Sequence, residues 1–281
     1  MDALSETALA GLFGLGGGIL LGLAAHIGRF CTLGALEDAL YGSDWRRIRM
    51  WALALAAAIT GVFLLEAYGA FEPGRTVYAR TVWDPTASIV GGLVFGYGMA
   101  IAGNCGYGAL SRAAGGELRS LVVVMAMGLS AYAALAGPLA PLRLALFPVE
   151  RVEPDHAGDG LAQLVGGALG AAPLLIALLI AAGRALWALS AADFRGSARH
   201  IFWSLAVGAA VVSGWAGTNY LAETGFEGVP VESHSFTAPI GETMLFLMTS
   251  SGAAAGFSVC SVLGVLLGAG AGALAQGAFR W

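Results

Sequence analysis

The chain has 281 residues, of which 58% are hydrophobic and only 11% are charged, and its mean hydropathy is +0.77. Soluble domains carry about 25% charged residues, so the composition excludes an ordinary soluble protein and indicates an integral membrane protein. The formal net charge is -4 and all fourteen basic residues are Arg. No surface for binding nucleic acid is expected.

Apolar runs that can cross about 30 Å of hydrocarbon recur along the chain. We predict an all-α, polytopic helical membrane protein with about seven spans, at residues 7–28, 47–69, 84–102, 118–137, 160–183, 199–217 and 255–278. Three short apolar segments, 29–42, 103–116 and 238–251, lie between spans. The first two are too short to cross and too apolar for solvated loops, so we predict re-entrant half-helices there.

The arginines are distributed unequally between the two sides of these spans. Ten lie on one side and four on the other: Arg29, Arg46, Arg47, Arg49, Arg112, Arg119, Arg184, Arg195, Arg199 and Arg280 against Arg75, Arg80, Arg143 and Arg151. Because cytoplasmic loops collect positive charge, we expect the N-terminus outside and the C-terminus in the cytoplasm.

An internal repeat appears when the sequence is compared with itself at an offset of 74 residues. GGILLGLAAHIGRFCTLGAL (17–36) then aligns without a gap with GGLVFGYGMAIAGNCGYGAL (91–110), and Cys31 matches Cys105. Two spans separate the copies, so both run in the same direction and the repeat is parallel. We expect one membrane domain over residues 1–281, with repeat copies at about 17–69 and 91–137.

Each copy is a glycine-faced span that breaks near its end, places a Cys at the break and restarts as a short helix. The glycines allow close helix packing and a tight turn at the break. Free N–H groups at the start of a half-helix favour an anion, so we expect a small anion site beside Cys31 and Cys105. Asn104 is a candidate amide donor to that anion or, as an alternative, a cap for the half-helix that follows.

Several stretches of the chain resemble one family. RFCTLGALED, RRIRMWALALAAAITG, GYGMAIAGNCGYGALSRAAGG, SHSFTAPIGETMLFLMTSSG and SVLGVLLGA are similar to the YeeE/YedE family and its sulfur-transport domain, which includes thiosulfate uptake proteins. The resemblance extends over most of the chain. It implies uptake of a small sulfur-containing anion, thiosulfate first of all, along a central path lined by cysteines.

Carried over by motif, this resemblance assigns the path to Cys31 and Cys105, each followed three residues later by a glycine, Gly34 or Gly108. Cys260 is a looser match because it lies in GFSVCSVLG and lacks that glycine. Family members usually continue beyond position 281 with another glycine-rich span and another Cys motif. By this resemblance, the chain is expected to be either a shortened version or a fragment of a longer product. If the missing piece closes the path, the chain needs a partner or does not transport alone.

We expect neutral thiols that donate weak S–H hydrogen bonds to the anion, without a covalent step. The alternative for each Cys is burial as a small apolar side chain in a helix contact. Arg29 and Arg112 either draw anions to the cytoplasmic mouth or only mark the orientation. His26, inside the first span, is a candidate for proton coupling or a neutral His bonded to a neighbouring helix.

Other functions are less well supported by the sequence. A membrane thiol enzyme would need a reactive thiol, but the chain has no C-x-x-C pair and no Cys beside a clear His base. We expect no catalytic residue, no cofactor and no metal, because three cysteines without spaced His or Met ligands make a poor soft-metal path. A non-transporting permease subunit is a further alternative. The expected partners are the anion, the lipid bilayer and, by resemblance, a cytoplasmic sulfur-carrier protein.

Overall fold

The structure is a computed structural model that describes residues 5–76, 78, 83–148, 160–250 and 254–280. Over these residues the chain is helical, and its one β-type pairing is an isolated parallel bridge between Thr76 and Val231. Six helices are long and apolar enough to cross a membrane, and a helix pair bent by 116° is a seventh candidate. The predicted all-α multi-pass architecture is therefore confirmed. Arg80 and Arg151 lie outside the described residues.

The helices belong to two compact units, with one boundary inside α2 (Thr32–Tyr41), after Leu33. Unit 1 holds α1 (Glu6–His26), α4 (Pro85–Ala102), α5 (Gly106–Ala114), α6 (Leu118–Leu135), α7 (Ala140–Leu146), α12 (Thr237–Thr249) and α13 (Phe257–Ala275). Unit 2 holds the rest of α2, α3 (Arg46–Ala67), the 3-10 turn η1 (Pro73–Arg75), α8 (Leu161–Leu169), α9 (Pro173–Leu189), α10 (Ala192–Arg195) and α11 (Ala198–Thr224).

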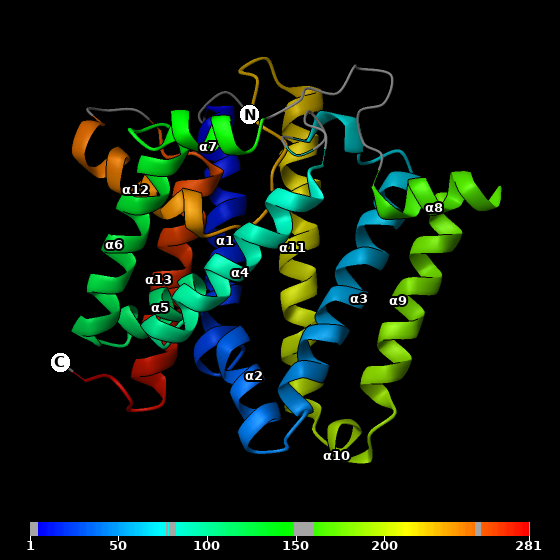
Figure 1. The fold of residues 1–281 in the computed structure, drawn as a ribbon, viewed down its shortest axis with the longest axis horizontal. Coiled ribbons are helices and arrows are strands. Elements are labelled where there is room, and N and C mark those ends of the chain that lie inside the picture. The colour runs from blue at the N-terminus through cyan, green and yellow to red at the C-terminus, as the bar shows by residue number, and fades with distance from the viewer. Residues whose placement is uncertain (1–4, 77, 79–82, 149–159, 251–253, 281) are drawn as a thin grey trace. The chain divides into compact units, whose positions relative to one another are not determined.

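Unit 1 is built on α1 and α13, which lie side by side and run in the same direction (Figure 1). A Cβ atom added at Gly18 would fall against the Ser261 carbonyl, and one at Gly264 would lie 2.5 Å from the Leu15 carbonyl oxygen. Small residues let helix backbones approach closely in lipid. The two helices therefore meet along glycines spaced by four residues: Gly14, Gly18 and Gly22 on α1, and Gly264, Gly268 and Gly272 on α13.

The other helices of unit 1 place α5 inside it. α5 packs against α6, α13 and α1, and five of its residues are buried. α12 packs on α6, where a Cβ atom added at Gly128 would lie 2.7 Å from the Ile240 side chain. The start of α4 is set by Asp84, whose carboxylate accepts a hydrogen bond from the Thr86 amide over 2.8 Å, as helix-capping residues do.

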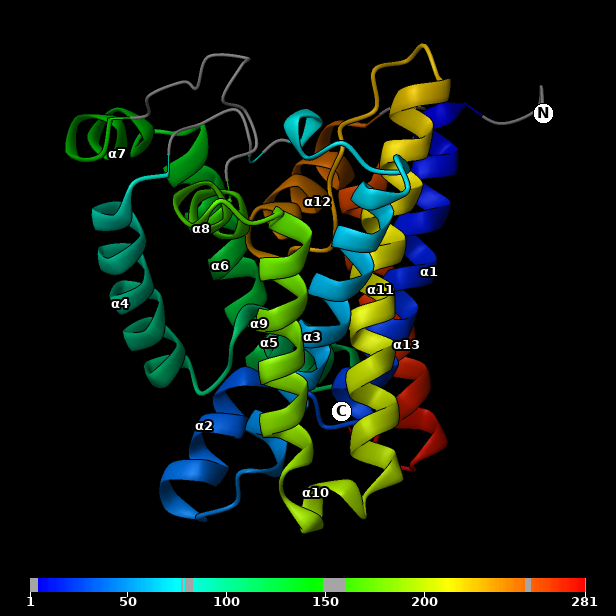
Figure 2. The same ribbon diagram turned by 90° about the vertical axis from the view of Figure 1, so that its right-hand side faces the viewer.

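In unit 2, α3 packs against both α9 and α11 (Figure 2). Gly208 of α11 meets Ala57 of α3 closely, since a Cβ atom added there would lie 2.7 Å from the alanine methyl. At the start of α3, the Arg49 guanidinium donates to the Trp187 carbonyl and lies 4.7 Å from the centre of its ring. This contact ties the start of α3 to the end of α9.

The predicted spans agree with α1, α3, α4, α6, α11 and α13, whose starts lie within two residues of those expected. α11 extends beyond its predicted end at 217 to Thr224. The segment predicted as one continuous span at 160–183 is broken, because α8 and α9 are bent by 116° relative to each other. Gly170, with φ 65°, ends α8 and Pro173 starts α9, which are the usual roles of glycine and proline at helix ends.

The described arginines gather at one end of each unit. In unit 1 this is the end where α1, α5 and α13 finish, and it holds Arg29, Arg112, Arg119 and Arg280. In unit 2 it is the end where α3 and α11 begin, and it holds Arg46, Arg47, Arg49, Arg184, Arg195 and Arg199. The described arginines of the opposite ends are Arg143 and Arg75. This asymmetry agrees with the positive-inside rule, and the cytoplasmic C-terminus stays a prediction.

Candidate functional site

The two repeat copies break with the same backbone turn. α1 ends at His26 and α4 at Ala102, and the equivalent residues of the two breaks, Arg29 and Gly103, are left-handed with φ 55° and 70°. Glycine adopts this conformation freely, whereas the same conformation costs other residues roughly 1–2 kcal/mol of conformational energy. The prediction that glycine supplies the turn is right for the second copy and wrong for the first, where Arg29 takes that position.

The sulfur atoms of Cys31 and Cys105 lie together in unit 1, beside Gly108. A Cβ atom added at Gly108 would be 3.2 Å from Cys31 Sγ and 3.4 Å from Cys105 Sγ. The two thiols are hydrogen-bonded to each other, and neither forms a disulfide. Cys105 is buried and Cys31 is half-buried. The structure thus brings together two of the three cysteines that the sequence singled out.

The Cys105 sulfur lies where two short helices begin. Cys105 is the N-cap residue of α5, and its Sγ accepts a hydrogen bond from the Gly108 amide over 3.3 Å. Thr32, the first residue of α2, hydrogen-bonds to the same sulfur through its backbone amide and its hydroxyl. Helix starts expose N–H groups and the positive end of the helix dipole. The surroundings of this sulfur therefore favour an electron-rich atom.

Asn104 adds a buried amide to this group. Only 7% of the residue is exposed, and its Nδ2 donates to Ser120 Oγ of α6 over 3.4 Å. Its Oδ1 has no hydrogen-bond partner in the described part of the chain and would lie 3.9 Å from a Cβ atom at Gly108. Since Cys105 caps α5, the alternative of Asn104 as the cap is wrong. We name Cys31, Cys105, Asn104 and Gly108 the thiol cradle.

Cys260 lies near the other end of α1. Its Sγ is 3.6 Å from the Ala255 carbonyl oxygen and would be 2.9 Å from a Cβ atom at Gly11. Fifteen residues of α1 separate Gly11 from His26, which is about 22 Å at 1.5 Å per residue. The structure therefore does not place Cys260 in the thiol cradle.

Side chains that the sequence did not single out lie between these two positions along α1. His234 fills the space beside Gly17, with its Nδ1 2.7 Å from Ser261 Oγ. Further along, Tyr107 donates its hydroxyl to a carbonyl of α1 and stacks on Phe236, with ring centres 5.2 Å apart. The chain just before α12 is not helical. The polar residues of its sequence SHSF are a local signal that could have indicated this break.

The remaining predicted residues lie elsewhere. Gly34 is in unit 2, and its missing side chain leaves room for the Arg47 guanidinium, which pairs with Asp38 over 2.9 Å. Gly34 thus differs from its repeat partner Gly108, which faces the thiols. Arg29 is exposed at the first break. Among the described residues, no group of three or more His, Cys, Asp or Glu is arranged to hold a metal ion.

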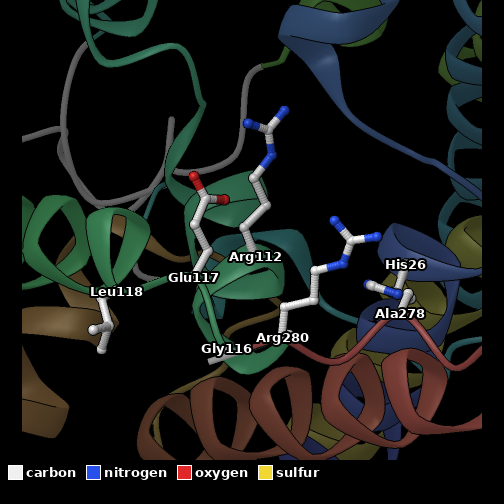
Figure 3. Close-up of a pocket in the computed structure, with 8 residues that line it drawn as sticks. His26, Arg112, Gly116, Glu117, Leu118, Ala278 and Arg280 are labelled. Carbon is white, nitrogen blue, oxygen red and sulfur yellow. The ribbon is translucent and has the colours of Figure 1, made fainter.

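His26 and Arg112 line one pocket at the arginine-rich end of unit 1 (Figure 3). The pocket has a volume of about 490 Å³, and its wall is completed by Gly115, Gly116, Glu117, Leu118, Ala278 and Arg280. Arg112 lies in the last turn of α5 and Cys105 caps its start, so the two are roughly 10 Å apart along the helix. The pocket and the thiol cradle thus occupy opposite ends of α5.

The chain is similar to one protein family and to several named transporters. A family model described as sulphur transport matches residues 26–281. The chain is 25% identical to the thiosulfate transporter TsuA of Spirochaeta thermophila over 267 residues, 94% of this chain and 77% of that relative. It is 30% identical to the thiosulfate transporter TsuA of Escherichia coli over 40% of this chain and 31% of that relative. The probable transporter YedE of Escherichia coli is 29% identical over 39% of this chain and 25% of that relative.

Proposed function

The chain belongs to the sulphur transport family, whose model matches residues 26–281, and from this premise we propose that it takes up a small sulfur-containing anion. We propose thiosulfate as the anion, since two relatives are named as thiosulfate transporters. The proposed location is the bacterial inner membrane with a cytoplasmic C-terminus. The gathering of arginines at one end of each unit supports this orientation.

The observation that carries this proposal is the thiol cradle, in which two thiols and a buried amide meet at the starts of α2 and α5. Thiosulfate has two negative charges, oxygen atoms and a polarizable terminal sulfur. Helix starts offer N–H groups to the oxygens, and the thiols of Cys31 and Cys105 exchange their mutual hydrogen bond for S–H donors to the terminal sulfur. Because a neutral thiol is a weak hydrogen-bond donor, the anion binds weakly enough to be released, and no covalent step is needed.

Asn104 supplies the adjustable part of the proposed site. Its Oδ1 has no donor among the described residues, and a buried acceptor without a partner costs about 1–3 kcal/mol. Rotating the amide by half a turn would direct Nδ2 toward the cradle and let Oδ1 accept from the Ser120 hydroxyl. A bound anion would then gain a donor, and the amide would lose its unpaired acceptor.

Other residues have proposed roles outside the cradle. We propose Cys260 as a separate thiol station, at the level of Gly11 on α1. His26 is proposed for proton coupling and Arg29 for attracting anions, because both lie at the arginine-rich end of unit 1. A cytoplasmic sulfur-carrier protein is the proposed receiver of the anion at that end.

Growth on thiosulfate tests this function. Cells without other sulfur uptake routes should grow when they express the wild type, and Cys31→Ala or Cys105→Ala should abolish growth because each removes a donor of the cradle. Ser130→Ala is the matched control, since it also removes one small polar group in unit 1, one that bonds only within its own helix. Undiminished growth of both cysteine variants at equal expression would remove the thiol mechanism.

A membrane thiol enzyme is the second candidate, and the contact between Cys31 and Cys105 favours it. Two neighbouring thiols allow one to attack the terminal sulfur of thiosulfate as a thiolate, so that the S–S bond of thiosulfate breaks, sulfite leaves and a Cys persulfide forms. The second thiol then attacks the Cys sulfur of this persulfide, which releases hydrosulfide and forms a Cys31–Cys105 disulfide. This reaction predicts a covalent sulfur adduct that survives denaturation after exposure to [35S]thiosulfate. Transport through neutral thiols predicts no such adduct.

A further inference from the structure

The pocket at the arginine-rich end of unit 1 contains two guanidinium groups without a counter-ion among the described residues. No ion pair or side-chain hydrogen bond joins the Arg112 or Arg280 guanidinium to the described part of the chain, although Glu117 lines the same pocket. Three other arginines have a carboxylate partner: Arg46 pairs with Asp44, Arg47 with Asp38 and Arg75 with Glu72. Arg112 and Arg280 thus place two cationic groups without a carboxylate partner in the described chain on one cavity.

Arg280 is held in the pocket by its backbone. Its amide donates to the Gly115 carbonyl over 3.1 Å. Gly116 has φ 96°, and a Cβ atom there would collide with the Arg280 carbonyl. The segment after α13 is thus fixed to the turn between α5 and α6, so that Arg280 and Arg112 line the same cavity (Figure 3).

Neither arginine is needed to cap a helix. α1, α5 and α13 end at this pocket, and helix C-termini attract cationic side chains. Carbonyls near these three ends, however, already accept hydrogen bonds from backbone amides of the turns: Phe30 to Ala24 over 3.1 Å, Gly115 to Ser111 over 3.2 Å and Ala278 to Ala273 over 2.9 Å. The two guanidinium groups therefore remain available to a ligand.

We propose that this pocket binds a small divalent oxyanion between Arg112 and Arg280, with His26 as a third hydrogen-bonding group. Planar guanidinium groups donate two parallel hydrogen bonds to such oxyanions. A volume of about 490 Å³ accommodates a tetrahedral anion together with water. No cysteine lines the pocket, so it selects charge and shape, whereas the thiol cradle selects sulfur. A free anion and the phosphate of a lipid headgroup share this chemistry.

Equilibrium dialysis with [35S]sulfate tests the pocket on purified protein in an uncharged detergent at low ionic strength. Sulfate lacks the terminal sulfur of thiosulfate, so the result does not depend on the proposed uptake, and Cys31→Ala should bind sulfate like the wild type. Arg112→Gln and Arg280→Gln should each weaken binding by roughly tenfold or more, because each loses charge-assisted hydrogen bonds. Glu117→Gln should strengthen binding, since it removes the carboxylate that opposes the anion.

Arg119→Gln is the matched control, because it removes the same charge from the same end of unit 1 without lining the pocket. Sulfate binding that is equal in the wild type, Arg112→Gln and Arg280→Gln would overturn the proposal, as would an equal loss in Arg119→Gln. Native mass spectrometry then separates the two sources of the oxyanion. Anionic lipid retained by the wild type and lost from the Arg112→Gln, Arg280→Gln double variant assigns a lipid phosphate, and no difference in lipid assigns a free anion.

Discussion

Gly108→Ala fills the thiol cradle with one methyl group. The added Cβ atom would lie 3.2 Å from Cys31 Sγ, 3.4 Å from Cys105 Sγ and 3.9 Å from Asn104 Oδ1. These are the distances at which an atom hydrogen-bonded to both sulfurs would lie. The methyl group therefore takes the place of the anion without removing any of the side chains that are proposed to bind it.

The effect of this substitution on folding should be small. Gly108 is in the first turn of α5 and is not left-handed, so alanine adopts its backbone conformation, and replacing a helical glycine gains up to about 1 kcal/mol. Against this, the sulfur atom at 3.2 Å must move by a few tenths of an ångström, and crowding of this kind costs about 1–3 kcal/mol. The free energy of unfolding should thus change by no more than about 2 kcal/mol.

Uptake should respond much more strongly than stability. We expect the initial rate of [35S]thiosulfate uptake to fall by roughly tenfold or more, which corresponds to a loss of about 1.4 kcal/mol in binding. Gly98→Ala is the control, because it adds the same methyl group inside α4 with no atom within 4 Å. Wild-type uptake by Gly108→Ala at equal expression would refute the idea that the cradle is the binding site.

Three further predictions concern stability, each measured by unfolding of the purified protein in detergent. Gly18→Val should destabilise the fold by about 2 kcal/mol or more, because its Cβ atom collides with the Ser261 carbonyl of α13; an unchanged melting temperature would contradict the close α1–α13 contact. Gly103→Ala and Gly183→Ala should change the free energy of unfolding in opposite directions, although neither added methyl group meets another atom within 4 Å. Gly103→Ala should lower it by roughly 1 kcal/mol because Gly103 is left-handed, and Gly183→Ala should raise it by a similar amount because Gly183 lies inside a helix. The hydrogen bonds from the Arg46 side chain lower the pKa of Asp44 to about 2. The pair should therefore stabilise the protein above about pH 4 and lose this contribution as the pH falls through 2. The contribution should be less than about 1 kcal/mol because the pair is exposed, and the same acid dependence in Asp44→Asn would contradict this assignment.

The positions of most helices could be predicted because a bilayer demands long apolar segments, and these are visible in the sequence. The bend between α8 and α9 had local signals in Gly170 and Pro173. Hydropathy is averaged over the whole apolar segment, so it does not indicate such a bend. The short helices α7 and α10 were not predicted because neither has enough residues to form a periodic pattern.

The internal repeat predicted that Cys31 and Cys105 occupy equivalent breaks, and the structure places the breaks as expected. The contact between the two sulfurs depends on how α1, α2 and α5 pack, which one sequence does not encode in any local pattern. The contacts of Thr32 with the Cys105 sulfur and of Ser120 with Asn104 could not be predicted for the same reason. Arg29 in the left-handed position of the first break was also unexpected, because only its repeat partner is a glycine.

The separation of Cys260 from the other two thiols also follows from packing. Residue spacing places this cysteine near the start of α13, but only the parallel pairing of α13 with α1 sets it at the level of Gly11. Had the two helices been antiparallel, Cys260 would lie near the breaks. Helix direction was predicted from the number of spans, whereas the choice of packing partner required the structure.

The most direct measurement is [35S]thiosulfate uptake by liposomes that contain only the purified chain, compared with the Cys31→Ser, Cys105→Ser double variant. Our account predicts saturable uptake by the wild type and none above the empty-liposome background by the double variant, with both chains equally folded. Equal uptake by the two proteins would show that the paired thiols are not where the anion binds.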